Sequence, residues 1–210
     1  LMRQIDLFVQ ALARILFSKK LNDSEQFIGQ LDNLSSQFLG IDLDMLHSIP
    51  FENIVSFFSI NGNADLNRCF IAAELLREEF ESLESEDDLS DIYFESCLKS
   101  FLLYFESVSK LEELQNKDTF KKIDTVIDKI KQFQIPLSVK LKMFRYYEIC
   151  KNFAAAENIL HDLIEHAYSN IQKEAEEFYI RLLKESDEEL EKGNLPRDEV
   201  IDGLERNRKY

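Results

Sequence analysis

Helix breakers and covalent cross-links are scarce in this sequence. Its 210 residues include five glycines, three prolines, three cysteines and no tryptophan. Beside long runs of Leu, Ile, Phe, Glu and Lys, so few breakers exclude a fold built from many short strands and tight turns. An odd number of cysteines forms no complete disulfide framework, so Cys69, Cys97 and Cys150 indicate thiols in a reducing compartment.

Long apolar runs are missing too. No stretch approaches the roughly 18 apolar residues that a membrane span requires, and no signal-type segment with a cleavage site is evident. We therefore expect a cytoplasmic protein.

Basic residues are the scarcer charged class. The chain has 25 Lys and Arg against 40 Asp and Glu, a formal net charge of -15. A field of this sign repels nucleic acid, because proteins bind the phosphate backbone through Lys and Arg that release its counterions. We expect no nucleic-acid partner.

Patterns that carry catalysis or hold cofactors are also missing. His161 and His166 are spaced to lie on different helix faces, and the nearest approach to a di-iron motif is the single segment from Asp44 to His47. The chain has no glycine-rich phosphate loop and no nucleophile within an activating motif. We predict no catalytic residue, no metal and no cofactor, so the protein is not expected to be an enzyme.

What the sequence does contain is helical periodicity. Apolar residues recur at helical spacing through most of the chain, and 45% of all residues are hydrophobic. Pro50 is expected to open a helix that ends at residues 61–63. The pattern predicts an all-α fold of about nine or ten helices.

One five-residue pattern occurs twice, at residues 70–74 and 153–157, each time opening a helix with small side chains. Alanine at Ala73 and Ala156 would let neighbouring helices approach closely, so we expect both to be buried at helix crossings. We predict a single helical-repeat domain over residues 1–210. The acidic stretch 84–88 divides it into a possible N-terminal half, 1–84, and a C-terminal half, 88–210.

Residues 137–166 resemble a tetratricopeptide repeat. The positions that match its pattern are Tyr147, Phe153, Ala156, Leu160 and Leu163. The resemblance implies antiparallel helical hairpins stacked as a right-handed superhelix. An earlier copy near Ala73 is weaker, since Arg77 stands at an apolar position.

Residues 186–197 are similar to part of an uncharacterised bacterial helical-repeat family of unknown function. That resemblance implies a bacterial origin and no known activity.

The tetratricopeptide resemblance also implies a binding surface. The first helices of such repeats line a concave groove, and Lys142, Arg145 and Tyr146 interleave cations with an aromatic ring there. These residues are candidates to contact an acidic or carboxylate-ended peptide. The expected function is therefore a non-catalytic protein-protein interaction module for an unidentified protein or peptide partner. In the alternative interpretation, the aromatic rings belong to the core and the cations form a solubilising edge.

The first helix leads to a second hypothesis about the function. The helix is expected at about residues 2–18, and the first twenty residues carry four cations, Arg3, Arg14, Lys19 and Lys20, against one acid, Asp6. A basic amphipathic helix is typical of a membrane-surface or self-assembly protein. In that case an apolar face would be exposed for a membrane or a dimer partner: Ile5, Phe8, Leu12 and Leu16. We favour docking of this helix on the chain's own core, because the chain has few long loops.

Overall fold

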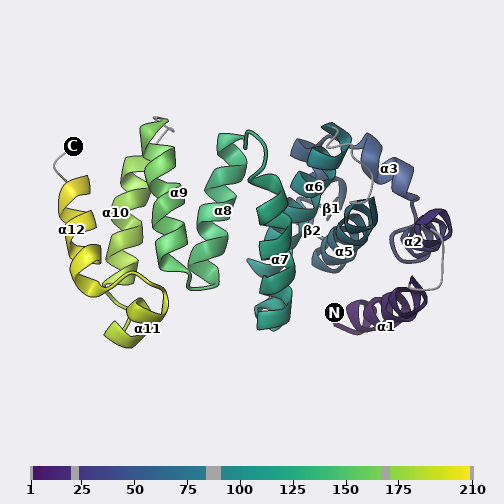
Figure 1. Cartoon of the computed structure of the whole chain (residues 1–210), viewed down its shortest axis with the longest axis horizontal. Helices are drawn as coiled ribbons and strands as arrows, with labels where there is room; N and C mark the ends of the chain where they lie inside the picture. Colours follow the sequence, from purple (N-terminus) through teal and green to yellow (C-terminus); the bar gives the residue numbers. More distant parts are fainter. Residues whose placement is uncertain (1, 20–23, 84–90, 167–170, 209–210) are drawn as a thin grey trace. The chain divides into compact units, whose positions relative to one another are not determined.

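The computed structural model describes residues 2–19, 24–83, 91–166 and 171–208. Over these residues it contains twelve α-helices, two short 3-10 helices and one ribbon of two strands (Figure 1). The predicted all-α class is confirmed. The chain forms two compact units, residues 1–134 (unit 1) and 135–210 (unit 2).

Unit 1 holds the longest described helices. Its α-helices are α1 (Met2–Lys19), α2 (Ser24–Leu39), α3 (Leu43–Ser48), α4 (Ile54–Phe57), α5 (Leu66–Leu83), α6 (Asp91–Val108) and α7 (Lys117–Ile130). The shorter elements are η1 (Phe51–Asn53), η2 (Glu112–Leu114), β1 (Ser59–Ile60) and β2 (Asn63–Ala64).

Helix α5 is the central helix of unit 1. It packs against α1, α2 and α6, and every residue from 69 to 80 is buried. Ala73 has no exposed surface, and the Ser100 hydroxyl of α6 donates to the Ala73 carbonyl oxygen over 2.9 Å. A side chain from α6 can reach the α5 backbone because alanine keeps this crossing narrow. The predicted burial of Ala73 is confirmed.

Helix α1 docks on this core, as the sequence favoured. Ile5, Phe8 and Leu12 are 3%, 0% and 4% exposed, and Leu16 is half-buried. The Phe8 ring meets Phe38 of α2 edge-on, with 5.4 Å between ring centroids. Ile5, Phe8 and Leu12 are therefore not exposed for a membrane or a dimer partner, because they are buried where α1 packs against α2 and α5.

The segment after Pro50 differs from the single helix expected there. Pro50 leads into η1 and the four-residue α4, and β1 then pairs antiparallel with β2, Ser59 opposite Ala64. Asn61 and Gly62 make the turn with φ of 53° and 80°. A type I′ hairpin turn needs positive φ at both central positions, which Asn-Gly supplies.

Unit 2 contains α8 (Leu137–Ile149), α9 (Phe153–Glu165), α10 (Ile171–Leu182), α11 (Asp187–Lys192) and α12 (Arg197–Asn207). The expected hairpin of α8 and α9 is confirmed, and Ala156 is fully buried. Its tight link uses Lys151 at a φ of 58°, followed by Asn152, whose side chain accepts from the Ala155 amide and caps α9. Along the chain, α10 packs against both α9 and α12.

The two units divide at residue 134, later in the chain than the expected subdivision at 84–88. Helices α5 and α6 flank the acidic stretch and pack against each other within unit 1. The stretch itself lies outside the described residues. Its charge interrupts the apolar periodicity without separating the helices on either side.

Candidate functional site

The structure places Lys142, Arg145 and Tyr146 on α8, but they do not share one exposed face. Tyr146 is completely buried beside Tyr147, so its ring does not lie on the surface where the sequence placed it. Lys142 is half-buried. The apolar face of α8 is wider than the sequence pattern indicated, since Val139, Met143 and Phe144 are buried with the two tyrosines.

Arg145 already has acidic partners. Its guanidinium pairs with Glu174 of α10 and lies 3.5 Å from Glu148, and Arg181 bonds the same two glutamates. The hydrogen bond to Glu148 raises the pKa of Arg181. Two arginines thus balance two carboxylates, and an acidic partner at Arg145 would have to displace an existing pair.

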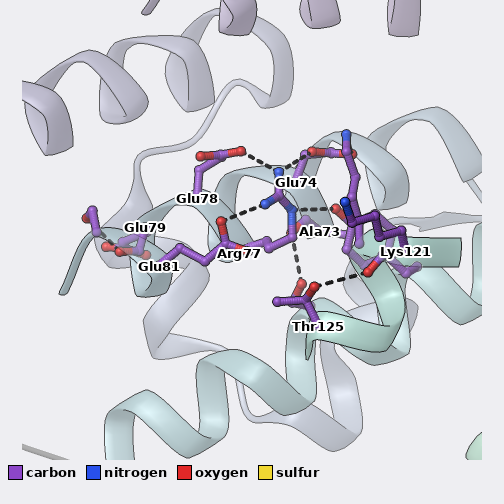
Figure 2. A network of polar contacts seen from close by, with 12 residues as sticks. Ala73, Glu74, Arg77, Glu78, Glu79, Glu81, Lys121 and Thr125 are labelled. Carbon is purple, nitrogen blue, oxygen red and sulfur yellow. Dashed lines mark hydrogen bonds and ion pairs between the residues drawn. The ribbon is translucent and has the colours of Figure 1, made fainter. Parts of the chain in front are cut away.

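A second set of charges lies inside unit 1, on the buried face of α5 (Figure 2). Glu74 and Glu78 are 0% and 4% exposed, and Arg77 between them is 7% exposed. The Arg77 guanidinium donates to Glu74 over 3.1 Å, to Glu81 over 2.8 Å and to Glu78. Its Nε donates to the Tyr104 hydroxyl of α6 over 3.2 Å. We call these residues, with Lys122, the α5 network.

Lys122 completes the network from α7, with its Nζ 2.5 Å from the second Glu74 oxygen. The fully buried Glu74 therefore has a cation on each carboxylate oxygen, as a buried charge requires. Burial raises the pKa of Glu78, although Arg77 opposes the shift. Burial lowers the pKa of Arg77, but Tyr104 and the surrounding carboxylates outweigh it and raise that pKa overall. With two cations and three carboxylates, the network carries one excess negative charge.

A groove of about 590 Å³ lies above this network, between α1, α5 and α7. It is lined by Val9, Arg77, Asp118, Lys121, Lys122 and Thr125. Three of these side chains are cations and one is an acid, in a chain whose net charge is -15. We call it the α7 groove.

Two donors in the α7 groove, the Lys121 ammonium and one Arg77 N–H, are unused among the residues that the structure describes. The exposed Lys121 ammonium makes no ion pair or hydrogen bond to a described residue, and Thr125 donates only to the Lys121 carbonyl oxygen, over 3.0 Å. Arginine has five N–H donors. Four of those on Arg77 are bonded, which leaves one on Nη1. An anion in the groove would meet Lys121 without breaking a bond seen within the chain.

A third polar cluster joins α3, α5 and α6. His47 Nε2 lies 2.9 Å from a Glu79 carboxylate oxygen, and the Ser96 hydroxyl lies 3.3 Å from His47 Nδ1. The sequence had considered His47 only as a metal ligand. A Ser–His–Glu sequence of contacts resembles a catalytic triad, but Ser96 is 4% exposed on a packed helix, so a substrate does not reach its oxygen. The cluster joins three helices.

Lys99 lies beside this cluster. It is 1% exposed, and its ammonium donates to the carbonyl oxygens of Leu46 and His47 over 3.2 and 2.8 Å. Burial lowers the pKa of Lys99. The bonds satisfy carbonyls at the end of α3, where a cation also suits the helix dipole.

The cysteines show no sign of activation. Cys69 and Cys97 are buried, Cys150 is partly exposed, and all three are free thiols. Burial raises the pKa of Cys69 to about 12, which keeps it as a thiol at neutral pH. Among the described residues, no three His, Cys, Asp or Glu side chains gather closely enough to hold a metal ion.

Sequence reasoning missed the α5 network and the α7 groove. One signal was visible, because Arg77 occupies a position that the repeat pattern fills with an apolar residue. Its partner Tyr104 lies on α6, 27 residues along the chain, and Lys122, which pairs with Glu74, lies on α7, 48 residues from that glutamate. Only the packing of α5 between its neighbours brings them together.

Comparison with known proteins identifies the family. A family of unknown function, DUF6483, matches residues 1–210, and the chain belongs to it. This agrees with the expected resemblance to an uncharacterised family. No curated protein and no solved structure matches the chain. Among the helices that the structure describes, none has both the length and the apolar character needed to cross a bilayer.

Proposed function

We propose that this protein is a non-catalytic interaction module whose α7 groove binds an acidic segment of a protein partner. The observation that carries the proposal is the set of cations that line the groove, of which Lys121 has no ion partner among the described residues. Arg77, Lys121 and Lys122 line it against the single acid Asp118, although the chain as a whole is strongly acidic. Complementary charge gives such an interface its orientation and specificity.

The positions of the cations favour a carboxylate over a neutral ligand. Lys121 stands at the rim with its ammonium unused among the described residues, whereas Lys122 is held by Glu74. Lys121 would therefore make the first new ion pair, and Arg77, which also lines the groove, keeps one N–H without a partner among the described residues. The overall negative charge opposes an acidic partner at long range, but at about 150 mM salt this repulsion is screened beyond roughly 8 Å.

The helical hairpin of α8 and α9 supports a tetratricopeptide-like interaction role, and buried thiols suit a reducing cytoplasm. The bacterial origin implied by the resemblance remains a prediction. Because Tyr146 is buried and Arg145 is paired, we place the acidic partner in unit 1 rather than on α8.

The test uses a fluorescent peptide of four Glu-Ala repeats, with four Gln-Ala repeats as the neutral probe, followed by fluorescence anisotropy. Lys121→Glu should weaken binding of the acidic peptide about 2–10-fold, the effect of changing one exposed ion pair. Lys173→Glu is the matched control, because Lys173 is an 82% exposed lysine in unit 2 outside the groove. It should leave the affinity unchanged.

Three outcomes would overturn the proposal. They are no saturable binding of the acidic peptide, binding of the Gln-Ala peptide as tight as that of the Glu-Ala peptide, and binding by Lys121→Glu that equals the wild type. A thermal melt of each variant confirms that it is folded before binding is compared.

A further inference from the structure

Unit 2 contains a cavity that the proposed function does not use. It has a volume of about 260 Å³ and lies between α9, α10 and α12. Ile164 and the ring of Tyr179 supply apolar walls, with the bare backbone of Gly203 beside them. The polar lining residues are His161, Gln172, Arg206 and Asn207. At about 30 Å³ per water, the volume equals roughly nine waters.

Gly203 makes this arrangement possible. A Cβ at position 203 would lie 2.4 Å from the Tyr179 ring and 2.8 Å from its hydroxyl oxygen. Glycine inside a helix is unfavourable by roughly 1 kcal/mol relative to alanine, so packing explains its presence better than helix propensity. Without a side chain at 203, the edge of the Tyr179 ring lies directly against α12.

The Tyr179 hydroxyl is fixed at one end of the cavity. It donates to a Glu157 carboxylate oxygen over 2.8 Å and lies 3.4 Å from His161 Nε2. Burial raises the pKa of Tyr179, and the bond to Glu157 adds to the shift, so the phenol stays protonated at neutral pH. The ring therefore presents a neutral wall to a ligand.

Arg206 is the charged group of the cavity. It is exposed, and its Nε donates to the Asp202 carbonyl oxygen over 3.3 Å. Its two terminal Nη groups make no bond to any residue in the described part of the chain. A guanidinium presents parallel N–H donors that match the two oxygens of a carboxylate. The cavity thus combines an apolar interior with one unused carboxylate-binding group.

We propose that this cavity binds a small monocarboxylate with an apolar body, its carboxylate on Arg206 and its body against Ile164 and Tyr179. A compact ring or short chain fits the volume, and one positive group suits one negative charge. The site is independent of the α7 groove, which lies in the other unit, so either can fail without the other.

The probes are 3-phenylpropionate and octanoate, with 3-phenylpropionamide as the neutral isostere. Titration into the full chain is followed by ¹H–¹⁵N NMR. We expect saturable shifts at the amides of residues 161, 164, 203 and 206, with a Kd of about 0.1–1 mM, typical of ligands this small. The amide should bind about tenfold more weakly, because it lacks the charge that Arg206 recognises.

Arg206→Gln should raise the Kd of the acids about tenfold. Arg208→Gln is the matched control, because Arg208 follows on the same helix end, pairs with Glu176 and does not line the cavity. Ile164→Phe should block the cavity from the α9 side without removing a charge, and so abolish saturation. Each variant's amide spectrum reports whether it is folded.

The proposal fails if neither acid saturates the wild type at 10-fold above the expected Kd, if the amide binds as tightly as the acid, or if Arg206→Gln and Arg208→Gln behave alike. The last probe is a peptide that ends in Phe with a free carboxylate. If it binds far more tightly than 3-phenylpropionate, the occupant is a protein C-terminus and the small-molecule proposal is overturned.

Discussion

The two units differ in whether they bury polar and charged side chains. In unit 1 the described buried residues include eleven polar or charged side chains: Ser35, Asn67, Glu74, Arg77, Glu78, Glu79, Ser96, Lys99, Ser100, Ser107 and Thr119. In unit 2 the described buried positions hold apolar or aromatic side chains and two glycines, and the ion pairs lie nearer the surface.

This difference separates two roles for an ion pair. A buried charge must be compensated, because leaving it alone in the interior is far more costly than exposing it to water. When one partner of a half-exposed ion pair is removed, water solvates the charge that remains, so the loss of stability is small. The comparison therefore predicts that similar arginine substitutions differ strongly between the units.

The largest effect is expected for Arg77→Met. This change leaves the fully buried Glu74 with Lys122 alone and removes the cation from Glu78, so the free energy of unfolding should fall by about 3–5 kcal/mol. Urea unfolding followed by far-UV circular dichroism measures the loss, and hydrogen exchange locates it in unit 1. Adding Glu78→Leu should recover part of it. A loss below about 1 kcal/mol would contradict the distinction between the units.

The next effect tests packing rather than charge, and should be similar in both units. Ala73 and Ala156 each have no exposed surface, so replacing either with leucine should overpack its helix crossing and destabilise by about 1–3 kcal/mol. Ala13→Leu is the control, since Ala13 is exposed on α1 and should be nearly neutral. Thermal melts compare the three variants. A neutral result at both buried alanines would show that the crossings have room for a larger side chain.

A smaller effect is expected for Arg181→Met in unit 2. Arg181 is 36% exposed and bonds Glu148 and Glu174, which are themselves partly exposed and keep Arg145 as a second cation. Its loss should therefore cost only about 0.2–1 kcal/mol. The same urea assay applies, so the ratio to Arg77→Met is measured directly. Equal losses of stability for Arg181→Met and Arg77→Met would show that burial does not determine how much these ion pairs contribute.

Periodicity in the sequence was sufficient to predict the helices and much of the core. The scarcity of long loops favoured the docking of α1, and the repeated pattern of small side chains predicted the burial of Ala73 and Ala156; both depend on features that are local in the sequence. Periodicity missed the β1–β2 ribbon, since strands of two residues are too short to show alternation, and Asn61-Gly62 ends a helix as plausibly as it turns a hairpin.

The candidate sites were less predictable, for a different physical reason. The α7 groove needs side chains from α1, α5 and α7, and the unit 2 cavity needs a glycine on α12 beside a tyrosine on α10. Each depends on the register of helices that are distant in sequence. Tyr146 shows the same limit at one residue, because the position that looked accessible on α8 faces inward once its neighbours pack.

The smallest expected effect is a change in pH dependence at Glu78. Burial raises the pKa of this carboxyl above its value in the unfolded chain, about 4.3, while Arg77 opposes the shift and Glu81 and Glu74 add to it. The folded state therefore binds the proton more tightly. This stabilising contribution is complete below about pH 4.3 and is lost as pH rises through the folded pKa.

Glu78→Gln keeps a neutral group that still accepts from Arg77, so its stability should match the wild type in acid and exceed it at neutral pH. Urea unfolding from pH 4 to 8 measures the difference, with Glu177→Gln, an exposed carboxyl in unit 2, as the control for losing one negative charge. If the two variants differ from the wild type by the same amount at every pH, the proton is not held at Glu78, and the α5 network tolerates its excess negative charge.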